Sequence, residues 1–346
     1  MTRALVTGST GGVGANLIAA LNTHGVEVVG LRRRTSPNDA VGDLRLTFVT
    51  GDILDLASLR PAMEGVDWVF HVAAIADDWN FPAQTVYKVN VEGTQNVLEA
   101  AYRAGVKRFV FTSSAAALGR PRRGRLLLTE QDEYNLRPEE WPYGYSKYLA
   151  MQIVEEYAGK GLHAVSVLPT AILGPRDVKF ISGELLVRAL RREVFPLPDG
   201  GVNFVDSRDV AAGHIAAAEH GRPGERYILG GHNLTHSEIL RTISEVLGIP
   251  IRCVRIPRWA LPVLAEAVGV LLKLGVHLPI ERTRVLLSGE YMYYDNSKAV
   301  RELGLTPRPF AETVADAYRW YVEHGFFARR GIPRSSLPSL TDVLSK

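Results

Sequence analysis

Residues 7–14 read Thr-Gly-Ser-Thr-Gly-Gly-Val-Gly, and this run lies between a short apolar stretch and an amphipathic stretch that extends to about Thr23. Glycines at positions 8, 11 and 14 let the backbone turn tightly, approach a diphosphate and pack a helix against a strand. A helix that begins at such a turn offers free N–H groups and its positive dipole end to phosphates. The pattern therefore predicts a strand–turn–helix unit that binds a dinucleotide. The predicted contact residues are Gly8, Thr10, Gly11, Gly12, Val13 and Gly14.

Short apolar segments alternate with amphipathic helices through the first half of the chain. The predicted strands are residues 4–7, 26–31, 47–50, 68–73, 109–112 and 164–168. Helices are predicted near residues 85–104 and 143–158, and Asp55 is placed to cap a short helix. Repeated strand–helix–strand units form a parallel sheet with helices on both faces. We therefore predict an α/β fold with a doubly wound parallel sheet, the Rossmann architecture.

The pattern loosens after Pro169, where the chain becomes richer in proline and glycine. A helix at 209–220 and a strand at 226–229 indicate a return to the sheet, and 237–247 is predicted to be an isolated helix. We expect a smaller, interrupted C-terminal substrate domain. The expected division is residues 1–170 and 206–230 for the dinucleotide-binding domain, 171–205 and 231–328 for the substrate domain, and 329–346 for a loosely packed tail.

The composition excludes several classes of function. Lys and Arg total 40 against 37 Asp and Glu, so we expect no nucleic-acid partner. The single cysteine, Cys253, excludes an intramolecular disulfide and suits a reducing compartment, and the N-terminus resembles no secretory signal, so we expect a cytoplasmic location.

The most apolar stretch covers residues 261–280. It contains Glu266 and Lys273 and has prolines at its margins, which argues against a membrane span. We expect a buried or interdomain helix here rather than a helix on a membrane surface.

The end of the second predicted strand bears on the choice of cofactor. An acidic residue there would bind a ribose 2′-hydroxyl, whereas this chain has Arg32-Arg33-Arg34, whose planar guanidinium groups suit a 2′-phosphate. NADP(H) is therefore the preferred cofactor and NAD(H) remains possible; the competing interpretation is a solvated basic loop. Asp52 after the third strand could accept from the adenine amino group or cap a turn.

The sequence Pro142-Tyr143-Gly144-Tyr145-Ser146-Lys147 opens a predicted helix. Tyr143 and Lys147 are four residues apart and so share one helical face, whereas Tyr145 faces elsewhere. A nearby ammonium would favour the phenolate of Tyr143, which could then exchange a proton with an alcohol oxygen. Ser114, at the carboxyl end of the fifth strand, is the preferred residue for orienting the substrate oxygen, with Ser113 as the second choice.

These motifs resemble the extended short-chain dehydrogenase/reductases, also called the NAD-dependent epimerase/dehydratase family. The matching segments are TGSTGGVG (7–14), GDILD (51–55), HVAA (71–74), NVEGTQNVLEA (90–100), FTSSA (111–115), YGYSK (143–147), LPTAILGP (168–175), RDVAAGH (208–214) and ELGLTPRPF (302–310). Within this family the chain is most similar to the dihydroflavonol reductase-like proteins, including the hopanoid-associated sugar epimerase branch.

The resemblance implies that Ser114, Tyr143 and Lys147 form a catalytic triad, with Asn90 as a structural and proton-relay member. The alternative for Asn90 is a helix-kinking asparagine that bonds to backbone. A homodimer built from the helices that begin near Asn90 and Tyr143 is also implied. His71 is expected to be a satisfied strand-end histidine, and no metal is expected. The further cofactor contacts expected are Ile53, Ala73, Ala74, Lys147 and Pro169.

Departures from the family pattern favour one reaction. Sugar 4,6-dehydratases carry an Asp-Glu pair where this chain has Ala115-Ala116, and many sugar-nucleotide epimerases have a tyrosine where it has Leu118. We expect Leu118 to give the pocket an apolar lining, which suits a carbonyl compound with a hydrophobic body more than a polyhydroxy sugar. We therefore favour NADP(H)-dependent interconversion of a ketone or aldehyde with an alcohol. The alternatives are a sugar or sugar-nucleotide epimerase with retained NAD, and a non-catalytic NADP(H)-binding sensor. Residues 77–81 and 176–204, with Trp79, Phe180 and Phe204, are expected at the pocket rim, although plain packing is favoured for the two phenylalanines.

Overall fold

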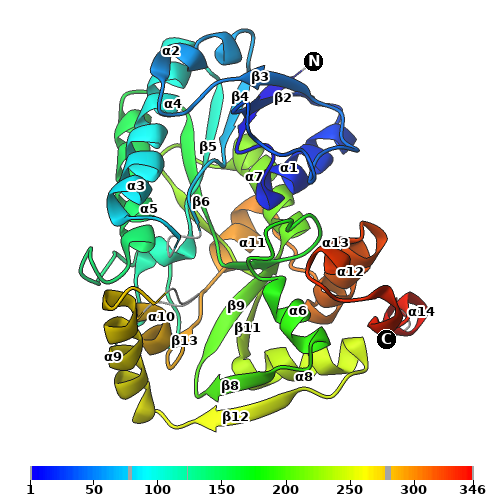
Figure 1. The fold of residues 1–346 in the computed structure, drawn as a ribbon. Helices are drawn as coiled ribbons and strands as arrows, with labels where there is room; N and C mark the ends of the chain where they lie inside the picture. The colour runs from blue at the N-terminus through cyan, green and yellow to red at the C-terminus, as the bar shows by residue number, and fades with distance from the viewer. Residues whose placement is uncertain (1, 77–79, 123, 277–281, 345–346) are drawn as a thin grey trace.

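The computed structural model describes residues 2–76, 80–122, 124–276 and 282–344. Within these residues a seven-stranded sheet has the order β10-β6-β5-β4-β1-β2-β3, and every pair of neighbouring strands is parallel. The strands are β1 (Arg3–Thr7), β2 (Glu27–Arg32), β3 (Thr47–Thr50), β4 (Trp68–His71), β5 (Arg108–Thr112), β6 (Ala164–Pro169) and β10 (Arg226–Leu229). The predicted α/β fold with a parallel sheet is confirmed (Figure 1). Strand β10 returns late in the chain to the edge of this sheet.

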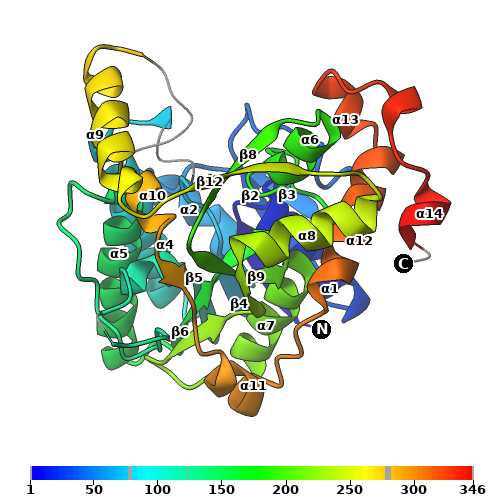
Figure 2. The same cartoon turned by 90° about the horizontal axis from the view of Figure 1, so that it is seen from below.

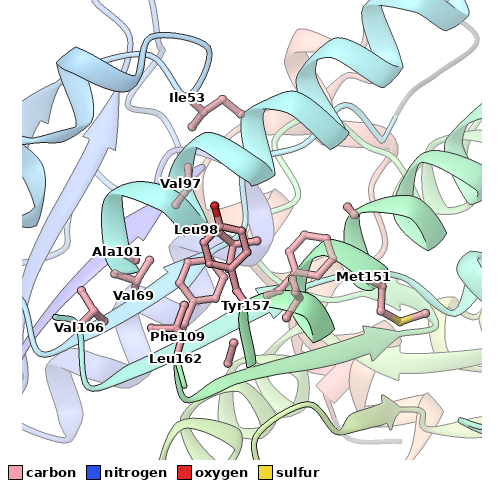
Figure 3. Packing of buried hydrophobic residues seen from close by; sticks show 14 of the residues in the cluster. Ile53, Val69, Val97, Leu98, Ala101, Val106, Phe109, Met151, Tyr157 and Leu162 are labelled. Carbon is pink, nitrogen blue, oxygen red and sulfur yellow. The ribbon is translucent and has the colours of Figure 1, made fainter. Parts of the chain in front are cut away.

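Alternation along the strands divides the core into two layers. In β1, Leu5 packs on one face of the sheet, while Ala4 and Val6 pack on the other. The first face is covered by α4 (Gly93–Arg103) and α5 (Pro142–Gly159), and the second by α1 (Gly12–Thr23), α7 (Ser207–His220) and α11 (Ser297–Leu303). Figure 3 shows part of the first layer, in which Phe109 of β5 packs near Leu98 of α4 and Tyr157 of α5.

Of two helices predicted in this half of the chain, one agrees with the structure and one differs in detail. Asp55 caps α2 (Leu56–Leu59) as expected, because its carboxylate accepts from the N–H of Ala57. The helix expected at 85–104 is divided into α3 (Ala83–Tyr87), a π-helical turn (Lys88–Glu92) and α4. A π-helical turn is uncommon and often marks a functional site.

The rest of the chain forms a second sheet and its helices. Strand β9 (Gly201–Asp206) pairs with β7 (Ala171–Leu173), β11 (His232–Thr235) and β13 (Tyr291–Met292), and β8 (Val194–Pro198) pairs with β12 (Arg252–Ile256). The helices are α6 (Glu184–Leu190), α8 (His236–Leu247), α9 (Ala260–Lys273), α10 (Arg282–Leu287), α12 (Phe310–Glu323), α13 (Phe326–Arg329) and α14 (Leu340–Leu344). We retain the two-domain division given above as a proposal.

The expectation of a loosely packed tail is wrong. Ile332 and Val343 are buried in the hydrophobic core that α8 and α12 form beside the second sheet. The hydroxyl of Tyr318 donates to the carbonyl of Pro338 at 2.7 Å. These apolar and polar contacts hold residues 329–344 against α8 and α12.

The expectation of a buried or interdomain helix in residues 261–280 is also wrong for residues 261–276, and residues 277–280 lie outside the described residues. In α9 only Leu261 and Ala265 are buried, whereas Val263, Val270 and the following Leu274 are 65%, 54% and 74% exposed. Among the described residues, no helix is both long and apolar enough to cross a bilayer.

The first core layer yields a stability prediction. Leu98 is fully buried and Leu126 is 79% exposed, so the same Leu→Ala change probes opposite environments. We expect Leu98→Ala to lower the free energy of unfolding by roughly 2–5 kcal/mol. Leu126→Ala should change it by less than about 0.5 kcal/mol. Urea denaturation measures both, and equal effects of the two variants would contradict the assignment of this core.

Candidate active site

The glycine turn joins the carboxyl ends of β1 and β4. Gly8 has φ +66°, and a Cβ built on it would lie 2.7 Å from the backbone nitrogen of Ala73. A Cβ on Gly14 would overlap the carbonyl of Gly8. Both positions therefore require glycine, one for its backbone conformation and both for close backbone approach. The turn lies where β1 meets β4, the point at which the chain reverses its direction across the sheet and at which ligands of such sheets bind.

Helix α1 begins at this turn with its N–H groups available. Its N-cap, Gly11, supplies no side-chain hydrogen bond to the first turn, and Gly12 and Val13 line a cavity. A helix start of this kind favours an anion through its N–H groups and its dipole. The turn thus fits the pyrophosphate of a dinucleotide.

The cavity has a volume of about 580 Å³ and runs from the glycine turn to the second sheet. Its wall on the side of the parallel sheet includes Ala74, Thr112, Ser113, Ser114, Tyr143, Lys147 and Pro169. Its opposite wall includes Asp177, Ile181, Ser182, Val202, His236, Arg284, Leu287, Met292 and Tyr294. Side chains from both parts of the chain therefore enclose one space of the size of a ligand pocket.

Helix α5 places Tyr143 and Lys147 on this cavity. Pro142 occupies the first helical turn, where its missing N–H costs nothing, and the i, i+4 spacing aligns the two side chains on one face. Lys147 is 3% exposed, and its Nζ donates to the carbonyl oxygen of Thr112 at 2.7 Å. Burial lowers the pKa of Lys147 from 10.5 to about 7. Tyr145 packs elsewhere as predicted, 5.4 Å from the ring of Tyr134.

The two serines after β5 have different hydrogen-bond roles. The Oγ of Ser114 accepts from the N–H of Ala116 at 3.2 Å, whereas the Oγ of Ser113 donates to the carbonyl of Lys147 at 3.4 Å. Both residues line the cavity. The Ser114 hydroxyl acts as an acceptor here and retains its hydrogen for a further partner, while the hydrogen of Ser113 is engaged.

Comparison with known proteins decides the family. The profile described as "NAD dependent epimerase/dehydratase family" matches residues 4–230. The chain belongs to this family. It is 39% identical over 331 residues to a putative dihydroflavonol 4-reductase of Synechocystis, covering 93% of this chain and 95% of that protein. It is 33% identical to sterol demethylase protein B of Methylococcus capsulatus, with 93% and 98% coverage.

The solved structures agree with this assignment. The crystal structure of gox2253 superposes with a TM-score of 0.82 at 33% identity, covering 94% of this chain and 99% of that one. The chain is thus an extended short-chain dehydrogenase/reductase, an NAD(P)-dependent enzyme of the epimerase/dehydratase family.

Asn90 lies behind the cavity wall in the π-helical turn. Its Oδ1 accepts from the N–H of Ile75 at 2.8 Å, and its Nδ2 donates to the carbonyl of Ile75 and to the Oγ of Ser146. Ser146 in turn donates to the carbonyl of Tyr143 at 2.7 Å. Asn90 therefore ties the loop after β4 to the first turn of α5, with bonds to backbone as in the structural alternative.

His71 is satisfied by protein groups, as predicted. Its ring nitrogens contact the hydroxyls of Thr7 at 2.7 Å and Thr94 at 3.0 Å. Burial, and secondly the charge of Lys147, lower the pKa of His71 to about 3, so the imidazole is neutral. No cluster of three or more metal-ligating side chains occurs among the described residues.

The residues expected near the adenosine end lie around the ends of β2 and β3. The guanidinium carbon of Arg32 lies 4.1 Å from the centroid of the Phe48 ring, and Arg33 is exposed. Asp52 accepts from the N–H of Leu54 at 2.9 Å, which is the capped-turn arrangement. Ile53 is 8% exposed and its side chain packs in the first core layer. Thr10 lies in the glycine turn itself.

Sequence reasoning misplaced one residue and missed others. Leu118 is fully buried in the core, so it does not supply the apolar lining expected of it; Ala115 and Ala116 do line the cavity. Phe180 and Phe204 are buried core residues, as the packing interpretation held, and Trp79 with the rest of 77–79 lies outside the described residues.

The missed residues are His236, Arg284 and Tyr294, which line the far wall. They follow the Tyr143–Lys147 motif by about ninety residues or more and lie in no motif, so the local sequence holds no signal that would identify them.

The buried lysine gives a pH-dependent prediction. The unfolded chain holds this proton up to about pH 10.5, whereas the folded chain releases it near pH 7, so stability rises with pH in this window. Below about pH 7 the side chain of Lys147 is protonated in both the folded and the unfolded chain, so the folded state bears the full free-energy cost of a buried ammonium. We therefore expect Lys147→Met to raise the Tm of the cofactor-free protein at acidic pH, by an amount that shrinks as the pH approaches 10.5.

Scanning calorimetry over this pH range measures the effect. Lys160→Met, at an exposed position at the end of α5, is the control and should change the Tm little at any pH. A Lys147→Met variant that is destabilised equally at every pH would contradict the cost assigned to the buried charge.

Proposed function

We propose that this enzyme is an NADP(H)-dependent reductase that interconverts a ketone or aldehyde with an alcohol. The observation that carries the proposal is that Tyr143, Lys147 and Ser114 line the same cavity as Gly12 and Val13. A proton donor, a cation and a hydroxyl donor therefore converge beside the helix start that fits a pyrophosphate. When bound, the nicotinamide supplies the hydride that reaches the carbonyl carbon.

Residues of the chain bind the carbonyl oxygen of the substrate and transfer a proton to it. Ser114 donates its free hydroxyl hydrogen to that oxygen, and Tyr143 transfers its phenolic proton as the oxygen becomes an alkoxide. Lys147, one helical turn away, favours the resulting phenolate in its protonated form, which the negative phenolate in turn favours, and it binds the nicotinamide ribose. In the oxidative direction, the same phenolate removes the alcohol proton. Asn90 acts as a positioning residue, because it fixes the first turn of α5 through Ser146.

The proposed cofactor preference rests on two arginines at the end of β2. Arg32 is held by the ring of Phe48 and by a hydrogen bond to the Oδ1 of Asn38 at 2.8 Å, and the neighbouring Arg33 is exposed. Two guanidinium groups at this strand end suit the ribose 2′-phosphate of NADP(H), and no acidic residue occupies the position.

The proposed substrate is a carbonyl compound with an apolar body. Much of the cavity wall is aliphatic, including Ala76, Ile172, Ile181, Val202 and Met292. Such a wall favours a hydrophobic ligand over a polyhydroxy sugar, which would leave its hydroxyl groups without partners. The similarity to proteins named dihydroflavonol 4-reductase and sterol demethylase protein B agrees with this choice.

The first functional prediction separates Tyr143 from its neighbour Tyr145. Tyr143→Phe should lower kcat for NADPH-dependent carbonyl reduction by roughly 10²–10⁴-fold, because the proton donor is removed. Tyr145→Phe should retain activity, since that ring packs among Tyr87, Tyr134 and Tyr148. Steady-state assays over a panel of hydrophobic ketones and aldehydes measure both.

Two results would overturn this proposal. Unchanged activity in Tyr143→Phe would favour the non-catalytic sensor. Purified protein that retains NAD, shown by its absorbance, and turns over no added NADPH would favour the sugar epimerase.

The second functional prediction tests cofactor choice. The double variant Arg32→Ala/Arg33→Ala should raise the KM for NADPH by roughly 10- to 100-fold, because charge-assisted hydrogen bonds are lost. The KM for NADH should change little. Arg241→Ala, on the exposed side of α8, is the matched control. An equal rise for both cofactors would contradict the assignment of these arginines to the 2′-phosphate.

A further inference from the structure

The outer side of α9 is a continuous apolar surface that the fold leaves open. Leu261 and Ala265 pack inward against Val285 of α10, and these contacts fix the rotation of the helix. At 100° per residue the opposite side and one flank carry residues 263, 264, 267, 270 and 271 with the following 274, all of them Val, Leu or Ala and all exposed. Figures 1 and 2 both show α9 at the periphery of the molecule. We name these six residues the α9 apolar face.

Such a surface is unusual on a folded protein. Large side chains of this face, such as Val263 and Leu274, are more than half exposed, although each would gain free energy by leaving water. Contiguous apolar patches of this kind mark interaction sites, whereas single exposed apolar residues do not. Packing among the described residues gives no reason for the face.

Basic and aromatic residues border the α9 apolar face. Arg255 in β12, Arg258 and Lys273 are exposed, and Trp259, just before the helix, is 76% exposed. Two acidic residues lie nearby: Glu266 is paired with Arg282 at 2.9 Å, and Glu290 is paired with Arg258 at 3.6 Å, which leaves Arg255 and Lys273 as the main excess positive charge of the border. An apolar helical face with a basic border and a terminal tryptophan is the pattern of a helix that lies in the interface of an anionic bilayer.

We propose that the α9 apolar face docks on the surface of an anionic lipid bilayer. The 14 residues of α9 span about 21 Å, less than the roughly 30 Å hydrocarbon core, so the helix lies in the interface plane and does not cross. The apolar side chains enter the boundary between headgroups and acyl chains, and the basic border contacts lipid phosphates. Docking of this kind does not depend on which reaction the cavity supports.

The helix that carries the docked face packs against a helix of the cavity wall. Helix α10 packs against α9 through Val285, while Arg284 and Leu287 of the same helix line the cavity. A bilayer bound at the α9 apolar face is therefore separated from the cavity by α9 itself and by one short helix, α10. If the proposed function holds, a lipophilic carbonyl substrate reaches the cavity from the bilayer, and this second step rests on that function.

Vesicle sedimentation tests the docking. The purified full chain is mixed with vesicles of phosphatidylcholine alone or of equal parts phosphatidylcholine and phosphatidylglycerol. Wild type should sediment with the anionic vesicles. For the variant Val263→Glu/Val270→Glu/Leu274→Glu, the partition coefficient onto these vesicles should fall by roughly tenfold or more.

A second triple variant controls for added charge. Leu126→Glu/Val300→Glu/Leu344→Glu introduces the same three carboxylates at exposed apolar positions outside the face and should bind vesicles as wild type does. Circular dichroism and the urea midpoint verify that both variants fold. Replacing Arg255, Arg258 and Lys273 by Gln should selectively weaken binding to the anionic vesicles.

Three outcomes overturn the proposal. The first is wild-type protein that does not sediment with anionic vesicles, and the second is an α9 variant that binds vesicles as wild type does. The third is wild-type protein that binds no vesicles but is a dimer by light scattering, when the α9 variant is a monomer; the face would then be a contact between two copies of this chain. Both readouts are independent of catalysis, so failure of the reductase proposal leaves this test intact.

Discussion

The backbone of Gly8 lies so close to that of Ala73 that no side chain fits between them, and the cavity is organised around this contact. It joins the carboxyl ends of β1 and β4 where the strand order reverses, and the following turn directs the start of α1 toward the open edge of the sheet. The same edge receives the loop after β5 and the first turn of α5. The ends of β1 and β4, the loop after β5 and the first turn of α5 therefore meet at the cavity.

A buried charge is the second constraint on the site. Lys147 is enclosed by the sheet and by α5, where its Nζ has the carbonyl of Thr112 as a partner. Behind it lies a buried polar layer in which His71 and Asn90 bond to hydroxyls and backbone. The bonds of Lys147 and Asn90 hold α5 in one position relative to β5 and the loop after β4, and those of His71 join β4 to β1 and α4. Pre-organisation of this kind suits a site in which a proton must move along a fixed path.

The parts of the fold that the sequence predicts are those set by local chemistry. The glycine spacing at 8, 11 and 14, the alternation in the strands and the cap at Asp55 each act within a few residues, and the structure agrees at each. The spacing of Tyr143 and Lys147 likewise follows from helix geometry alone. The burial of Leu118 and of α9 was predicted wrongly. Burial depends on which distant segment packs against a residue, and the local sequence does not show which segment that is. The far cavity wall, with His236 and Arg284, could not be predicted for the same reason.

The central claim is that the glycine turn holds a dinucleotide beside Tyr143 and Lys147, and a crystal structure of the NADP⁺ complex tests it most directly. The account predicts the pyrophosphate at the N–H groups of Gly12 and Val13, with the nicotinamide ribose on the Nζ of Lys147 and the phenol of Tyr143 facing the nicotinamide. Cofactor bound with its nicotinamide outside this cavity, or with the phenol turned toward the protein core, would contradict it.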